Sequence, residues 1–486
     1  MRYAFIYFFL LTCHLGIGQI ALPKNDVQAY AEKLRSFEAI EQAPFSFYVK
    51  DLSNDSVIAN INGQMSIPAA SVMKLVTTAS ALKILGSKHQ FKTKLKYSGY
   101  IDTTTHTLHG NLYIIGAGDP TLGSKYYNEV GTAENFLYQW ADTVKTLGIQ
   151  QIEGTVIADG SIYHYDGVPT GWTWGDLGNY YGAGPNGLTI FDNLVQLEFK
   201  TGAEKTLTEL TCTMPYIPGF FIKNNVSAAK SNRDNAYVFG APYSFDWFVN
   251  GSIPRNKESF IVKAANPDPE LTFAIAFDYA LNQTGIHTDF NPTTNRQLEK
   301  DSSYQKPKLT SLYTHYSPSL SSIIDLTNQR SVNLFAEHLL CEISNKRSGF
   351  GSTHNGALIC KAYWKSKIGT TGLLMADGSG LSRSNAVSAK FLVELLNYMK
   401  GSQSLKNSLA ISGKKGTMAS IARNTSAHGR VYGKSGTMNK IKAYAGYVDT
   451  KTGKKLAYAM IINNYDCPTS KIKTYFQNLM IKMAEY

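Results

Sequence analysis

One short segment, Ile67-Pro68-Ala-Ala-Ser71-Val-Met-Lys74-Leu, constrains this chain most, because it places a serine and a lysine one helical turn apart at the start of a helix. Apolar residues at helical spacing follow as far as Leu85, and Pro68 stops the helix from extending backwards. Ser71 then lies at the positive end of the helix dipole, with Lys74 on the same face. The lysine amine can take the serine proton if its surroundings lower its pKa. The alternative for this motif alone is a helix cap followed by a solvated lysine.

Two later motifs supply the other polar groups that such chemistry requires. Ser331-Val332-Asn333 precedes a helical pattern, which puts a hydroxyl and a carboxamide on a turn at a helix start. Lys434-Ser435-Gly436-Thr437 follows a strand-like segment, and its glycine leaves room for a substrate backbone along a sheet edge. A serine acyltransferase without a histidine base needs a nucleophile, an amine, a second hydroxyl, and a cation for a substrate carboxylate. The three motifs together contain all four groups.

These motifs match the set Ser-x-x-Lys, Ser-Asp-Asn and Lys-Thr-Gly of β-lactamases and penicillin-binding proteins. Three further segments narrow the match: Gly116 to Leu122, Asp377 to Arg383, and Gly446 to Val448 leading to Ile461 to Asn464. From about residue 40 to its C-terminus, the chain resembles the class C low-molecular-mass penicillin-binding proteins, the D-alanyl-D-alanine carboxypeptidase and endopeptidase family. The resemblance implies an α+β fold, a β-lactamase/transpeptidase-like domain with large, mostly β inserted domains.

The strand pattern along the chain agrees with a five-stranded antiparallel sheet flanked by helices. Strands are expected at 45–50, 57–60, 429–434, 442–449 and 455–462, and a helix at 470–484 can cover the sheet. Ser71 and Ser331 are 260 positions apart, so a large segment is inserted between them. Short apolar runs in it, such as Phe273 to Phe277, indicate mostly β-structure. The expected organisation is a signal peptide at 1–18, the transpeptidase-like domain in 19–87 and 291–486, and inserted domains in 88–290, with 291–308 as the return linker.

The resemblance also implies the roles of the motif residues. Ser71 attacks the carbonyl of the penultimate D-alanine of a peptidoglycan stem peptide, Lys74 takes its proton, and an acyl-enzyme forms. Ser331 relays a proton to the leaving D-alanine, and Asn333 orients Lys74 and holds the substrate amide. Independently of the resemblance, Glu337, four residues after Asn333, is expected to support the helix on which it lies, with a direct catalytic role as the alternative. β-Lactams are expected to act as covalent inhibitors.

The segment from Lys434 to Thr437 is expected to bind the substrate. Lys434 and the Thr437 hydroxyl hold the terminal carboxylate, and the backbone N–H groups of Ser71 and Thr437 form the oxyanion hole. Ser435 replaces the usual threonine and keeps its hydroxyl, whereas an apolar residue replaces the usual aspartate of the second motif, which affects substrate preference. Gly436 of this segment is expected to leave room for the substrate backbone. The residues that align with family positions around the peptide side chain are Asp159, Ser379, Leu381, Arg383 and Met438. Among them, Asp159 is expected to face the amino end of a diaminopimelate side chain.

Composition and the N-terminus place the protein outside the cytoplasmic membrane. Residues 1–18 carry Arg2, an apolar run and small residues at Gly16 and Gly18, which is typical of a secretory signal for a periplasmic protein. The net charge of +12 comes from dispersed lysines, so we interpret it as attraction to anionic envelope polymers and not to nucleic acid. No transmembrane anchor, metal-ligand spacing or cofactor motif is found in the mature sequence. Cys341 and Cys360 form either one disulfide or two buried thiols.

Three functions remain open at this point. The first is a serine D,D-peptidase acting as carboxypeptidase, endopeptidase or both. The second is a serine esterase or β-lactamase on the same scaffold, which would turn β-lactams over rapidly. The third is a penicillin-binding wall sensor that is acylated without turnover.

Overall fold

The computed structural model describes residues 25–486, and the signal peptide expected at 1–18 lies outside them. A six-stranded antiparallel sheet forms the centre of the first unit, in the order β2-β1-β24-β23-β22-β21. Five of its strands are those expected from the sequence, and the two-residue β21 is an addition. The strands are β1 (Phe45–Asp51), β2 (Val57–Ile61), β21 (Ala410–Ile411), β22 (Val431–Met438), β23 (Ile441–Asp449) and β24 (Lys455–Asn463).

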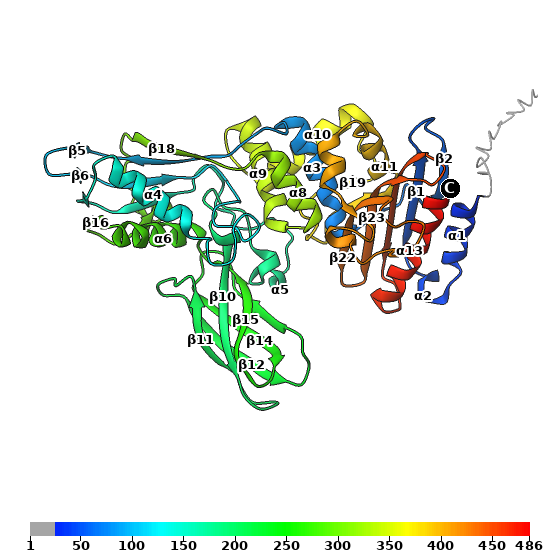
Figure 1. The fold of residues 1–486 in the computed structure, drawn as a ribbon, viewed down its shortest axis with the longest axis horizontal. Helices are drawn as coiled ribbons and strands as arrows, with labels where there is room; N and C mark the ends of the chain where they lie inside the picture. The colour runs from blue at the N-terminus through cyan, green and yellow to red at the C-terminus, as the bar shows by residue number, and fades with distance from the viewer. Residues whose placement is uncertain (1–24) are drawn as a thin grey trace, which may run out of the picture.

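Helices cover both faces of this sheet (Figure 1). Along β24, Tyr458 and Met460 pack against helices α1 and α13, whereas Ala457 and Ala459 face the core shared with α3 and α11. The small alanines let these two helices lie close to the strands. The fold class predicted from the sequence, α+β with a β-lactamase-like sheet, is confirmed. The bounds are α1 (Asp26–Arg35), α3 (Lys74–Ile84), α11 (Ala389–Tyr398) and α13 (Thr469–Glu485).

A second helical layer extends from the sheet and carries part of the site. Helix α9 (Asn333–Ser348) packs beside α3, between α8 (Leu320–Gln329) and α10 (Thr353–Ile368). Eleven of its sixteen residues are buried, so α9 is an interior helix. Its first residue, Asn333, is thereby held against the start of α3.

The inserted segment contains two units, which project from the first in Figure 1. The first insertion has a five-stranded sheet, β17-β9-β7-β4-β18, covered by α4 (Asn135–Thr146) and α6 (Pro269–Gln283). The run from Phe273 to Phe277 lies in α6, which corrects its assignment to β-structure: a short apolar run does not distinguish a buried helix from a strand. The strands of this sheet include β4 (Lys92–Tyr97), β7 (Leu112–Ile115) and β9 (Val156–Asp159). A four-stranded sheet beside it has the order β16-β8-β6-β5, with β5 (Tyr100–Asp102), β6 (Thr107–His109), β8 (Gln151–Ile152) and β16 (His287–Thr288).

The second insertion, nested within the first, consists of two three-stranded sheets packed face to face. Their orders are β11-β10-β15 and β12-β14-β13. Apolar side chains from both sheets form one core, in which Leu197, Trp247 and Val249 are buried. The strands are β10 (Leu194–Thr201), β11 (Glu209–Met214), β12 (Phe221–Ala229), β13 (Asn235–Phe239), β14 (Asp246–Pro254) and β15 (Lys257–Ala265).

The chain returns to the first unit later than the sequence suggested. Strands β17 (Thr293–Thr294) and β18 (Thr310–Tyr316) pair with β9 and β4 of the first insertion. The predicted boundary at 290 therefore falls inside this sheet, and the run taken as a linker includes β17 and the short helix α7 (Asn295–Leu298). Strand β17 has only two residues, and the seven residues of β18 are mostly polar or tyrosine, so neither shows the apolar alternation that marks a strand in sequence.

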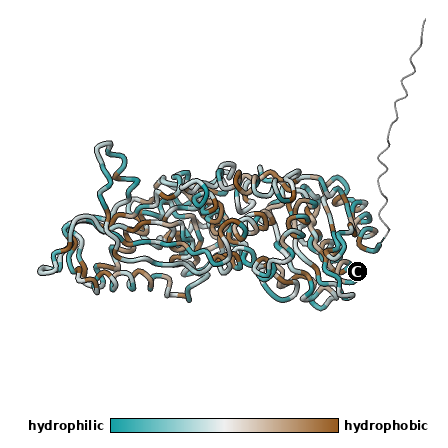
Figure 2. The backbone as a smooth tube through the Cα atoms, turned by 90° about the horizontal axis from the view of Figure 1, so that it is seen from above, coloured by the Kyte–Doolittle hydropathy of each residue, from teal (hydrophilic) through white to brown (hydrophobic). Residues whose placement is uncertain are grey.

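Two further expectations concern cysteines and membranes. All four cysteines of residues 25–486 are free thiols, and Cys341 and Cys360 are both buried, so the described chain contains no bridge between them. Within the same residues, no helix combines the length and the apolar character needed to cross a bilayer. Figure 2 shows the hydrophobic segments mainly inside the body and hydrophilic ones at protruding loops.

Candidate active site

The nucleophile expected from the sequence lies at a helix start. Ser71 belongs to a 3₁₀ turn, Ala70–Met73, that leads directly into α3. The Lys74 ammonium donates to Ser71 Oγ at 3.0 Å, to Asn333 Oδ1 at 2.7 Å and to the Ser379 carbonyl at 2.8 Å. Ala70 has a φ of 46°, a left-handed conformation that is uncommon for alanine and typical of strained functional turns.

Burial makes Lys74 a usable base. Its side chain is completely buried, and desolvation lowers the pKa of the amine to about 7. The carboxylates of Glu337 and Asp377 act in the opposite direction and raise this pKa. The loss of hydration outweighs their attraction, since a buried cation loses its water. The Lys74 amine is therefore partly neutral near neutral pH.

The second motif meets the third across the site. Ser331 has a φ of 60° on the turn before α9, and its Oγ accepts a hydrogen bond of 2.8 Å from the Lys434 ammonium. Lys434 is fully buried, and desolvation lowers its pKa, with the charge of Lys74 adding to the effect. The side-chain amide of Asn333 donates to the Tyr181 carbonyl at 2.8 Å. The structure thus brings all three motifs to one place.

Strand β22 carries the third motif along the edge of the Ser71 turn. A Cβ atom on Gly436 would lie 2.3 Å from the carbonyl oxygen of Ala69, so only glycine permits this close approach. Ser435 Oγ donates to Thr417 Oγ1 at 2.8 Å and takes no part in the contacts among the three motifs. The hydroxyl of Thr437 accepts a hydrogen bond of 2.5 Å from Lys442, a buried lysine of β23 that the sequence analysis missed. Its only sequence signal is a cation inside an otherwise apolar strand.

Two buried carboxylates hold the turn that positions Lys74. Glu337 accepts hydrogen bonds from the backbone N–H groups of Gly378 and Ser379, at 2.9 and 2.7 Å. Its role is therefore wider than support of its own helix. Burial, followed by the nearby charge of Asp377, raises the pKa of Glu337 to about 8. Asp377 accepts from the Trp172 indole N–H at 2.8 Å, which ties an insertion loop to this turn.

A cavity of about 540 Å³ opens from Ser71 between the first unit and the insertions. Of the residues expected around the peptide side chain, Leu381, Arg383 and Met438 line it. Ser379 is buried and does not line the cavity, and its hydroxyl accepts from the Leu381 N–H at 3.3 Å. A larger cavity, of about 780 Å³, lies between α4, α6 and β10 and contains none of the motif residues.

Asp159 does not line the cavity at Ser71. Its carboxylate is buried at the end of β9, where it pairs with Lys306. The acidic residue in the cavity is Asp176, which accepts from Thr173 Oγ1 at 2.7 Å at the start of α5 (Trp174–Leu177). The resemblance assigned this position to Asp159, which ends an apolar strand, whereas Asp176 lies in a four-residue helix within an irregular loop. The sequence signal that could have pointed to Asp176 is its Thr-x-x-Asp spacing with Thr173, which is typical of a helix start.

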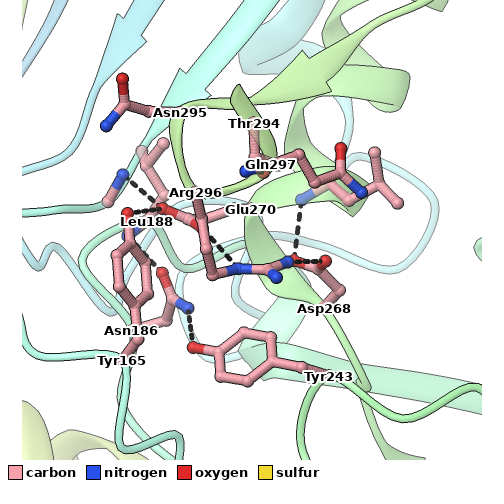
Figure 3. Close-up of polar contacts among 12 residues, drawn as sticks. Tyr165, Asn186, Leu188, Tyr243, Asp268, Glu270, Thr294, Asn295, Arg296 and Gln297 are labelled. Atoms are coloured by element: carbon pink, nitrogen blue, oxygen red, sulfur yellow. Dashed lines mark hydrogen bonds and ion pairs between the residues drawn. The ribbon is translucent and has the colours of Figure 1, made fainter. Parts of the chain in front are cut away.

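A buried polar cluster anchors the loop that carries Asp176 (Figure 3). Arg296 forms an ion pair with Asp268, lies 3.6 Å from Glu270 Oε2 and stacks over the ring of Tyr243 with 4.3 Å to its centroid. Glu270 accepts from the Gly160 N–H at the start of that loop. Burial, with the charge of Asp268, raises the pKa of Glu270 to about 8. The cluster fixes the start of the insertion loop relative to α6.

The sheet, its covering helices and the three converging motifs define a serine hydrolase of the β-lactamase and transpeptidase class. A sequence model of the D-Ala-D-Ala carboxypeptidase 3 (S13) family matches residues 27–482. The chain therefore belongs to this family, and the resemblance stated from its motifs is confirmed. The predicted class of enzyme, a serine-type D-Ala-D-Ala carboxypeptidase, is confirmed with it.

Similar proteins agree with the assignment. The D-alanyl-D-alanine carboxypeptidase of Actinomadura sp. (strain R39) is 27% identical, over 95% of this chain and 84% of that protein. The D-alanyl-D-alanine carboxypeptidase DacB of Haemophilus influenzae is 26% identical, over 89% of this chain and 88% of its own length. The crystal structure of penicillin binding protein 4 (dacB) from Haemophilus influenzae has the same fold, with a TM-score of 0.77 at 23% identity, covering 95% of this chain and 100% of that one.

Proposed function

We propose that this protein cleaves the D-alanyl bond of peptidoglycan stem peptides through an acyl-enzyme on Ser71. The observation that carries the proposal is the contact of the buried Lys74 amine with both Ser71 Oγ and Asn333 Oδ1. The neutral amine takes the Ser71 proton as the oxygen attacks the carbonyl carbon of the penultimate D-alanine. The resulting oxyanion is stabilised by backbone N–H groups of Ser71 and Thr437, each contributing about 3 kcal/mol.

Collapse of this intermediate breaks the peptide bond. Lys74 passes the proton it took from Ser71 to Ser331, whose hydroxyl is bonded to Lys434 and gives its own proton to the leaving nitrogen. The terminal D-alanine then departs, and Lys74 is neutral again. Water then attacks the acyl carbon while the neutral Lys74 takes one of its protons. The bond to Ser71 Oγ breaks, Lys74 returns that proton to Ser71 Oγ, and the shortened peptide leaves as the free acid. The substrate carboxylate lies beside Lys434 and Thr437, where its negative charge favours the protonated form of Lys434.

The cavity lining supports a substrate with a cationic side-chain terminus. Asp176 supplies the carboxylate there, and the nearby Tyr181 hydroxyl has a raised pKa because of burial and the charge of Asp176. We infer that Asp176 takes the role that the resemblance assigned to Asp159. Asp176→Asn should lower kcat/KM for a peptide with a free side-chain amine and change it little once that amine is acetylated. Equal losses on both peptides would contradict this assignment.

The scheme applies equally to a terminal peptide bond and to one within a cross-link, because the chemistry at Ser71 is the same for carboxypeptidase and endopeptidase action. The domain organisation fits it: residues 25–87 and those after Tyr316 build the catalytic unit, and the insertions form one wall of the cavity. A periplasmic location follows from the secretory signal proposed for residues 1–18.

The intact mass after incubation with benzylpenicillin tests the proposal. One adduct is expected, on the peptide that contains Ser71, with none on Ser71→Ala. Absence of both an adduct and drug consumption would overturn the acyl-enzyme mechanism. Rapid consumption without an adduct would instead support the β-lactamase alternative, and an adduct without release of D-alanine from any stem peptide would support the sensor.

A further inference from the structure

The outer face of the sheet β12-β14-β13 has an unusual composition for a solvent-facing surface. Its inward positions, such as Val249, belong to the core of the second insertion. The outward positions form rows across the three strands, and partners in register share a face. These rows are Lys223-Phe248-Phe239, then Asn225-Asn250-Tyr237, then Ser227-Ser252-Asn235. Aromatic rings thus lie next to amides and hydroxyls, and one lysine is the only cation in the three rows.

An exposed tryptophan extends the aromatic part of this face. Trp174 of α5 lies 6.3 Å from Phe239 and 6.4 Å from Phe248, measured between ring centroids, and the two phenylalanine rings stack at 5.0 Å. The Trp174 and Tyr237 side chains are 51% and 52% exposed. Exposed aromatic clusters of this kind mark binding surfaces, because burying them in a complex recovers apolar area that folding left in water.

This face is continuous with the cavity at Ser71. Tyr237 belongs to both, and Tyr180, which is 57% exposed, lines the cavity beside it. Trp174 lies between Thr173 and Gly175, which also line the cavity. A ligand that leaves the cavity on the side of the second insertion therefore meets the aromatic face directly.

We propose that this face, defined by Trp174, Tyr237, Phe239, Phe248 and Asn250, binds the amino-sugar chain that carries the stem peptide. The inference rests on the proposed function, since the stem peptide in the cavity is covalently attached to such a chain. Pyranose rings offer flat C–H faces for aromatic stacking and hydroxyl and amide groups for hydrogen bonds, and they are uncharged. The three rows supply these contacts: Asn225 and Asn250 are already joined by a hydrogen bond of 3.0 Å and keep further donors and acceptors.

This face carries almost no charge, which excludes charged polymers such as nucleic acid as its ligand. A nucleic-acid surface would need several lysines or arginines to neutralise phosphates, whereas these rows contain Lys223 alone, with Asp246 at their border. The occupant is therefore a neutral polar chain. The second insertion would hold the sugar backbone while the first unit cleaves the peptide.

A hexamer of β-1,4-linked N-acetylglucosamine is a suitable probe, because it contains the sugar and no peptide. Trp174 is the one exposed tryptophan of the described chain, since the other four are at most 8% exposed. We expect a saturable change in tryptophan fluorescence on titration of the full-length protein, absent from Trp174→Phe. Calorimetry should show that the dissociation constant for the hexamer rises at least about fivefold in Tyr237→Ala and in Trp174→Ala.

Phe290→Ala is the matched control, because Phe290 is 66% exposed but lies outside this face. It should bind the hexamer like the wild type, and thermal unfolding should show that all variants are folded. Failure of the wild type to bind the hexamer, or equal binding by all variants, would overturn the inference. Release of D-alanine from a short soluble peptide is measured in parallel, so failure of the proposed function is recognised separately.

Discussion

The pH dependence of acylation is the sharpest test of the site. Lys74 is completely buried, and desolvation lowers its pKa from 10.5 to about 7. Only the neutral amine can take the Ser71 proton. At pH 7 about half of the molecules hold a neutral Lys74, whereas a lysine with the ordinary pKa would be neutral in roughly one molecule in three thousand. Burial thus raises the fraction of molecules with a neutral Lys74 by about three orders of magnitude at neutral pH.

The second-order rate of acylation by a fluorescent penicillin measures this directly. We expect the rate to rise about tenfold per pH unit in the acid range, with a midpoint near pH 7 and a plateau above about pH 8. The rate falls at low pH because protonation of Lys74 leaves no neutral amine to take the Ser71 proton. Lys74→Arg should abolish acylation, because a guanidinium stays protonated throughout this range.

Lys442 requires a control, because burial lowers its pKa to about 7 as well. Lys442→Met removes the contact with Thr437 and should lower the plateau while leaving the midpoint unchanged. A profile that is flat across the range, or a midpoint that moves with Lys442→Met, would refute the assignment of the base to Lys74.

Three other predictions concern stability and close packing. Gly436→Ala should lower both the melting temperature and the rate of acylation, since its Cβ would lie 2.3 Å from a backbone oxygen; Gly401→Ala, with nothing within 4 Å, should be nearly neutral. His338 is buried and neutral, and burial lowers its pKa to about 3, so below pH 6.5 the unfolded state binds a proton that the folded state does not. The free energy of unfolding should therefore fall by up to about 4 kcal/mol between pH 6.5 and 3, and fall less in His338→Gln, in denaturant titrations; equal losses would contradict this. Trp172→Phe should lower the free energy of unfolding by about 1–3 kcal/mol in the same denaturant titrations, because the buried Asp377 loses a hydrogen-bond donor. An unchanged free energy of unfolding would show that this hydrogen bond does not stabilise the protein.

The sequence was sufficient for the parts of the site that depend on local structure. Ser71 and Lys74 are one turn apart on any helix that starts there, so their contact follows from spacing alone. The strands of the first unit also carry long apolar runs that are hard to misread. The same reasoning failed for α6, β17 and β18, where short apolar or polar runs fit more than one element.

Long-range placement was decided by the tertiary structure. Asp159 and Asp176 both belong to the same inserted segment, and only the packing of that segment shows which carboxylate reaches the cavity. The pKa of Lys74 likewise depends on burial by residues that lie hundreds of positions away, such as Asn333 and Ser379. Sequence alone therefore determined the chemistry of the nucleophile and its family, because both depend on local motifs. The fold determined the side-chain pocket, the basicity of the lysine and the aromatic face, because these arise from contacts between distant segments and from exclusion of water.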